Sequence, residues 1–130
     1  MIYSPQETLQ RRIERVLPTV IKPGRYVGGE LNHTHKDWES VRTHFALIFP
    51  DIYDLGQSNL GIALLYDILN QREDVAAERA FSPWIDMEAV MREADIPLFS
   101  LENKRPLSEF EIVGVSLPYE TIYTNFLNIL

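Results

Sequence analysis

Apolar and polar positions along the chain follow two different periods, and each period predicts a type of element. Residues 45–49 form a continuous apolar run that stops at Pro50, which is typical of a strand buried on both faces. Residues 112–117 form a second buried run, and residues 77–81 and 97–101 are shorter strand candidates. Apolar residues recur at helical spacing over residues 60–69, 87–94 and 119–130. Strands alternating with helices predict an α/β fold with a parallel sheet and flanking helices.

The N-terminal region follows a different pattern. Ser4 and Glu7 have capping-box spacing, so a helix is expected to begin at Ser4, and Pro18 ends it at about Leu17. Residues 22–29 are rich in turn-forming types. We therefore divide the chain into a helical and irregular extension, residues 1–40, and a sheet domain, residues 41–130. Within the sheet domain, Ser58 and Asp86 are the expected caps of two helices.

The expected sheet places the first strand near its centre, with the spatial order 3-2-1-4. Ligands of such sheets sit at the carboxyl ends of the strands, at the point where the order of the strands reverses. That point falls between the first and the last strand. Side chains that follow these two strands are therefore the candidate cofactor-binding residues: Asp51, Tyr53, Asp54, Ser58, Asn59, Ser116 and Tyr119. An alternative makes Ser58 and Ser116 helix caps and Tyr119 a core residue.

Charge is spread unevenly over the 130 residues. Residues 1–44 carry 7 Lys and Arg against 5 Asp and Glu, whereas residues 45–130 carry 5 against 14, and the formal net charge is -7. An acidic sheet domain repels phosphate backbones, which disfavours nucleic acid as a partner. No apolar run is long enough for a membrane span, and the N-terminus lacks the apolar core of a signal peptide, so a cytoplasmic protein is expected.

Several kinds of chemistry have no residues to carry them. Cysteine is absent, which excludes disulfides, thiolate catalysis and an iron-sulfur cluster held by this chain. His33, His35 and Asp37 are metal-ligand types, but no strand pattern surrounds them and no metal site is predicted. Gly-rich phosphate loops and nucleophile motifs are absent too, so no catalytic residue is predicted for this chain by itself.

Six segments, taken together, resemble one known family. They are residues 22–30 (KPGRYVGGE), 35–38 (HKDW), 49–56 (FPDIYDLG), 81–84 (FSPW), 97–107 (PLFSLENKRPL) and 113–120 (VGVSLPYE). In this order they resemble the N-terminal region of bacterial radical SAM proteins that have a cobalamin-binding-like domain. The similarity covers about residues 20–130.

The resemblance implies a small Rossmann-like (flavodoxin-like) domain that precedes a radical SAM barrel. That barrel would be the partner of this domain, and its cysteines would hold the four-iron four-sulfur cluster that cleaves S-adenosylmethionine. The full-length protein would then be a radical SAM enzyme. The last helix is still apolar at Leu130, so a chain truncated before the barrel is expected.

The resemblance leaves cobalamin open as a ligand, with one restriction. Domains that ligate cobalt through a histidine carry Asp-x-His-x-x-Gly after the first strand, and the corresponding loop here has Tyr53 in place of that histidine. Cobalamin would have to bind without a histidine ligand. Two hypotheses follow: an accessory domain that presents cobalamin or substrate to the barrel, or a non-catalytic packing module whose ligand crevice is degenerate and empty.

Overall fold

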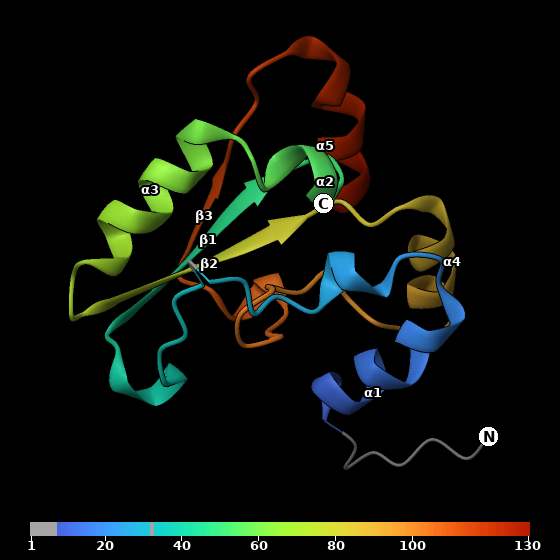
Figure 1. The fold of residues 1–130 in the computed structure, drawn as a ribbon, viewed down its shortest axis with the longest axis horizontal. Coiled ribbons are helices and arrows are strands. Elements are labelled where there is room, and N and C mark those ends of the chain that lie inside the picture. Colours follow the sequence, from blue (N-terminus) through green and yellow to red (C-terminus); the bar gives the residue numbers. More distant parts are fainter. Residues whose placement is uncertain (1–7, 32) are drawn as a thin grey trace.

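Three parallel strands form the centre of the protein. The computed structural model describes residues 8–31 and 33–130. The strands are β1 (Thr43–Phe49), β2 (Val75–Phe81) and β3 (Ile112–Val115), in the order β2-β1-β3 (Figure 1). Both pairings are parallel, with Phe45 opposite Ala77 on one side and opposite Ile112 on the other. The predicted α/β fold with a parallel sheet and a central first strand is confirmed.

Helices precede and connect the strands. The α-helices are α1 (Leu9–Val16), α2 (Tyr53–Gly56), α3 (Leu60–Asn70), α4 (Ile85–Glu93) and α5 (Tyr123–Ile129). The 3-10 helices are η1 (Leu17–Thr19), η2 (Pro23–Tyr26), η3 (Trp38–Ser40), η4 (Leu107–Glu109) and η5 (Glu120–Ile122).

Three predicted helix starts need comment. The start expected at Ser4 lies outside the described residues, and the first described helix begins after Thr8, whose side chain accepts from the Arg11 amide. Asn59, not Ser58, caps α3, because its side chain accepts from the amide of Ile62. The cap of α4 is Trp84, not Asp86, and Asp86 instead accepts from the amides of Ile21 and Met87.

Two apolar clusters stabilise the molecule. One lies between α3 and the sheet and is formed by Leu47, Phe49, Ile62, Tyr66, Ala77, Phe81 and Leu101. The other lies between the N-terminal extension and α4 and contains Ile13, Val20, Tyr26, Met87, Met91, Ile96 and Phe99. Figure 1 shows α1 and α4 next to each other, well away from α3. The extension thus shares a core with α4.

The segment predicted as a short strand at residues 97–101 is not a strand. It forms an isolated antiparallel bridge between Phe99 and Pro106, because the chain turns back at Lys104, which has a positive φ of 54°. The segment nevertheless lies beside β2, as the predicted order requires. The Leu101 amide donates to the Arg79 carbonyl at 2.8 Å.

Backbone groups along the outer edge of β2 have hydrogen-bond partners from other segments. Lys36 Nζ donates to the Val75 carbonyl at 2.6 Å. The side-chain amide of Asn70 pairs with both backbone groups of Ala77, at 2.9 and 3.1 Å. Glu102 accepts from the Arg79 amide at 2.8 Å. A buried edge strand therefore keeps its hydrogen bonds without a neighbouring strand.

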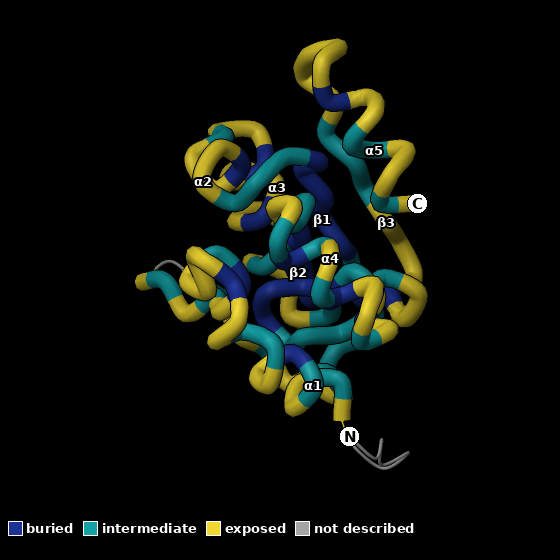
Figure 2. Tube along the Cα trace, turned by 90° about the vertical axis from the view of Figure 1, so that its right-hand side faces the viewer, coloured by how far each residue is buried: buried dark blue, intermediate teal, exposed yellow. Residues whose placement is uncertain are grey.

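The last strand differs from its prediction. Residues 112–117 were expected to be buried on both faces, but Ile112 is 45% exposed and Val113 is 46% exposed in β3. The physical reason is position, because β3 is an edge strand and α3 packs mainly over β2 and β1. Figure 2 shows β3 and α5 with largely exposed surfaces.

Replacement of Asn70 by alanine tests the capping of the β2 edge. The buried backbone groups of Ala77 would lose both partners, so the free energy of unfolding should fall by about 1–3 kcal/mol, measured by urea denaturation. Gln71→Ala is the matched control. Among the described residues the Gln71 side chain bonds only to exposed Asp67, so its loss should change stability by less than about 0.5 kcal/mol. Equal effects of the two variants would contradict this role of Asn70.

Candidate functional site

The carboxyl ends of β1 and β3 bring two of the predicted residues together. Asp51 follows β1 and Tyr119 follows β3, and the Tyr119 hydroxyl donates to Asp51 Oδ2 at 3.2 Å. The Tyr119 ring also meets Phe49 edge-on, with centroids 6.3 Å apart. Burial and the hydrogen bond to Asp51 raise the pKa of Tyr119. This pair lies at the point between first and last strand where the sequence placed a ligand.

Tyr53 and Asp54 instead turn toward the N-terminal extension. The Tyr53 hydroxyl donates to Glu30 Oε1 at 2.5 Å. Asp54 accepts from Arg25 at 2.9 Å and from Lys22 at 3.5 Å. Both side chains are therefore engaged by the segment that precedes the sheet.

The other predicted residues serve local structure. Ser58 Oγ donates to the Leu55 carbonyl at 3.3 Å, and Asn59 caps α3. The Ser116 amide donates to the Ile48 carbonyl at 2.9 Å and so prolongs the β1–β3 pairing. The structure brings together Asp51 and Tyr119 but does not collect the predicted residues around one opening.

The space near this edge is small. A cavity of about 10 Å³ is lined by Tyr53, Phe81, Ser82 and neighbouring residues, which is about the volume one water needs. The backbone at Gly56 packs directly against two aromatic rings, which leaves little space at this edge. A Cβ at this position would come within 2.4 Å of the Phe81 ring and 2.9 Å of the Phe49 ring. In the described part of the chain, the predicted residues do not form a pocket that fits a corrin ring.

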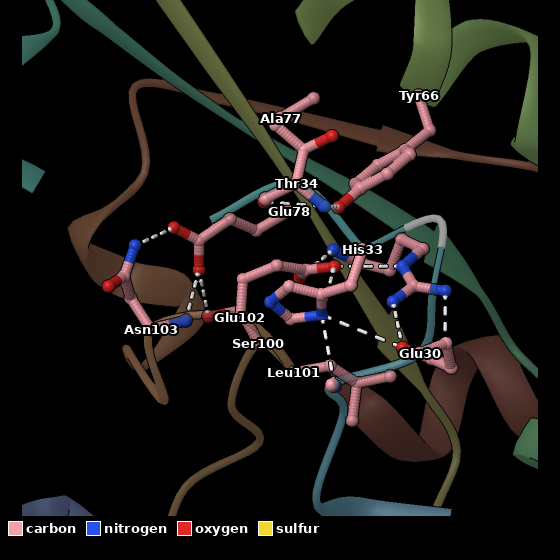
Figure 3. A network of polar contacts seen from close by, with 12 residues as sticks. Glu30, His33, Thr34, Tyr66, Ala77, Glu78, Ser100, Leu101, Glu102 and Asn103 are labelled. Atoms are coloured by element: carbon pink, nitrogen blue, oxygen red, sulfur yellow. Dashed lines mark hydrogen bonds and ion pairs between the residues drawn. The ribbon is translucent and has the colours of Figure 1, made fainter. Parts of the chain in front are cut away.

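A partly buried cluster of polar and charged side chains lies on the α3 side of β2 and was not predicted. We call Glu30, Tyr53, Arg79 and Glu102 the Arg79 cluster, of which Figure 3 labels Glu30 and Glu102. The Arg79 guanidinium donates to Glu102 Oε1 at 2.8 Å and to Glu30 Oε2 at 3.0 Å. It also lies 4.9 Å from the centroid of the Tyr66 ring. Two carboxylates and an aromatic face thus hold one buried cation.

The surroundings shift the pKa values of this cluster. Burial opposes the ionisation of Glu30, but hydrogen bonds from Arg79 and Tyr53 outweigh it and lower the pKa of Glu30 to about 2. Burial and the bond to Glu30 raise the pKa of Tyr53 to about 12. Burial raises the pKa of Glu102, against the opposing effect of Arg79. The two carboxylates raise the pKa of Arg79, although its burial acts in the opposite direction.

A second polar cluster lies on the opposite face of β2. Glu78, only 2% exposed, accepts from Ser100 Oγ at 2.6 Å and from the Asn103 amide at 2.9 Å. Because Glu78 and Arg79 are consecutive in a strand, they point to opposite faces. The segment 100–103 therefore holds β2 from both sides (Figure 3).

His33 lies beside the Arg79 cluster. Its Nδ1 accepts from the Gly29 amide at 3.1 Å and lies 3.5 Å from Glu30. Gly28 has a positive φ of 70°, and a Cβ there would approach the Leu101 carbonyl to 2.9 Å. Among the described residues, no group of three or more His, Cys, Asp or Glu side chains is arranged to hold a metal ion.

One sequence signal pointed to these clusters. Glu78 and Arg79 interrupt the otherwise apolar run of residues 75–81, and charges in a buried strand require partners. Their partners could not be read from the sequence because Glu30 and Glu102 lie 49 and 23 positions away from Arg79. With its donors and acceptors paired, the Arg79 cluster fixes loops in place and does not offer a free acid or base.

A larger cleft lies elsewhere, between α1 and α4. Its volume is about 720 Å³, and its lining is Arg12, Arg15, Val16, Thr19, Val90, Glu93, Ala94 and Asp95. Arg12 donates to the Ala94 carbonyl at 2.7 Å across it. None of the predicted site residues lines this cleft. No helix in the described part of the chain is long and apolar enough to cross a membrane.

Acid titration of a Glu30→Gln variant tests the Arg79 cluster. The folded-state pKa of Glu30 is lowered, so its carboxylate stabilises the protein above the ordinary pKa near 4.5, and this contribution is lost as the pH falls toward about 2. The stability difference between the wild type and Glu30→Gln should be constant from pH 7 to 5 and shrink below about pH 4.5. Urea denaturation at each pH measures it, with exposed Glu39→Gln as control. A difference that does not change with pH would contradict the role of Glu30.

Comparison with known families agrees with this architecture over most of the sheet domain. Residues 61–130, more than half of the chain, match the family described as radical SAM proteins, N-terminal. The match runs from α3 through β2, α4 and β3 to α5. No curated protein and no solved structure matched the chain. The chain belongs to the family of N-terminal domains of radical SAM proteins.

Proposed function

We propose that this accessory domain is a docking module, which packs through β3 and α5 against the rest of the radical SAM chain to which it belongs. In this proposal the iron-sulfur cluster and the S-adenosylmethionine site lie in that other part, a radical SAM barrel. The present chain has no cysteine with which to hold the cluster.

One observation carries the proposal. Exposed apolar side chains gather on β3, on the following segment and on α5, and we call them the β3–α5 face: Ile112, Val113, Leu117, Tyr119, Tyr123, Leu127 and Leu130. In Figure 2, β3 and α5 lie on the same side of the molecule. Exposed apolar side chains that gather in one region in this way mark an interaction site.

The carboxyl edge of the sheet supports the same reading. Tyr53, Asp54 and Asn59 are engaged by groups of the protein, and the small cavity beside Tyr53 has room for about one water. A domain that uses its fold for packing can fill this edge in such a way. The charged clusters then serve to hold β2 and its loops rigid.

Shortening of two side chains tests the docking. Tyr123 and Leu127 are 48% and 67% exposed, so Tyr123→Ser with Leu127→Ser should leave the domain folded. In the full radical SAM protein, this double variant should lose about 1.5–3 kcal/mol of docking free energy for each side chain that docking buries fully. Calorimetry should then show a separate, earlier unfolding transition of the domain. Leu31→Ser, at a fully exposed position outside the face, is the control. A variant that melts like the wild type would contradict the proposal.

A second candidate function is the presentation of cobalamin or a substrate to the barrel. The hydrogen-bonded pair of Asp51 and Tyr119 favours it, because the pair lies at the carboxyl ends of β1 and β3. Cobalamin would bind there without a histidine ligand, since Tyr53 stands where that histidine would be. A ligand would also have to displace side chains that are now paired.

Titration of the full radical SAM protein with hydroxocobalamin and methylcobalamin tests this second function. If it holds, both forms should co-elute with the protein, and Asp51→Asn with Tyr119→Phe should weaken binding by about tenfold, which corresponds to 1.4 kcal/mol. Tyr123→Phe is a matched control away from the pair. Absence of co-elution from the full protein would exclude the presentation of cobalamin.

A further inference from the structure

The two edges of the sheet differ in whether other segments cover them. The outward backbone groups of β2 bond to Lys36, Asn70 and Glu102 and to the Leu101 amide. Among the described residues, β3 pairs only with β1, and its second edge faces no strand. An unprotected edge is a template for another strand.

The register identifies the groups that this free edge presents. The Ser116 amide donates toward β1, to the Ile48 carbonyl, and Leu47 lies opposite Gly114. Backbone groups alternate in direction along a strand, so Gly114 faces β1, whereas Val113 and Val115 direct their N–H and C=O groups outward. Val113 and Val115 are therefore the residues with which an added strand would pair.

The side chains of β3 also favour a strand over a surface that docks on one face. Ile112 and Val113 are both nearly half exposed, and as consecutive strand residues they point to opposite faces of the sheet. A partner lying on one face would cover one of them. A strand added at the edge would bring its own side chains over both.

The charge of this region indicates the partner. Residues 105–130 contain Glu109, Glu111 and Glu120 against one cation, Arg105, which pairs with Glu109 at 3.3 Å. The balance of charge around the edge is therefore acidic and favours a partner strand with basic flanks. A second copy of this chain is disfavoured, because each copy carries a net charge of -7. The larger radical SAM chain supplies a partner by family membership.

We propose that a strand with basic flanks from the rest of the radical SAM chain adds to the free edge of β3 and extends the sheet to the order β2-β1-β3-added strand. The strand runs parallel to β3, like every pair already in the sheet. This inference rests on the proposed docking function and names its geometry. It makes Val113 and Val115 the backbone anchors of docking.

A proline substitution in the full radical SAM protein tests the backbone contacts. Val113→Pro removes an outward N–H and leaves the β1–β3 ladder intact, as edge strands tolerate. Val113→Ala removes most of the side chain and keeps the N–H. Val113→Pro should give the separate domain transition that is expected for Tyr123→Ser with Leu127→Ser, whereas Val113→Ala should give a smaller shift. Equal small shifts for both variants would overturn strand addition.

Hydrogen exchange resolved to single amides gives a test that does not depend on a proline variant. The Val115 amide should exchange about tenfold more slowly in the wild type than in the undocked double variant, since docking would give it an acceptor. The Gly114 amide, bonded toward β1, should change little and serves as the internal control. Suppose that the double variant undocks but the Val115 amide already exchanges fast in the wild type. That result would overturn strand addition and leave the docking function standing. Failure of the double variant to undock would overturn the docking function itself.

Discussion

The buried edge of β2 is the constraint on which the rest of the structure depends. Its outward backbone groups must find partners, because a buried unpaired N–H or C=O costs about 1–3 kcal/mol. The N-terminal extension supplies Lys36, α3 supplies Asn70, and the loop after α4 supplies Leu101 and Glu102. Segments distant in the sequence are thus held in place by one strand.

The charged side chains of β2 extend this control to both faces of the sheet. Arg79 draws Glu30 and Glu102 together on one face, and Glu78 holds Ser100 and Asn103 on the other. Such pairs are worth little unless their hydrogen bonds are complete, since taking charges out of water is costly. The bonds from Arg79 and Tyr53 to Glu30 meet this condition and account for its pKa of about 2. The clusters therefore stabilise an arrangement of loops.

The opposite edge explains how such a domain can serve a larger protein. β3 has short length, exposed apolar side chains on both faces and no strand on its outer side among the described residues. A parallel sheet is normally covered on both faces, and the exposed side chains of β3 depart from this rule. The edge of β2 is held by hydrogen bonds, and the edge of β3 is open. The two features together suit a module that docks as a preformed unit.

The sequence alone determined the α/β class, the central position of β1, the helix that becomes α3, and the contact between the segments after β1 and β3, where Asp51 meets Tyr119. These features follow from local periodicity and from the short list of topologies that parallel strands permit. The sequence did not determine the exposure of β3, because the pattern of an apolar run is the same whether or not other elements of the fold cover the strand. Nor did it determine the Arg79 cluster, whose members come from four separate segments. Only the tertiary structure brings them together, since long-range pairing of charges leaves no periodic pattern in the chain.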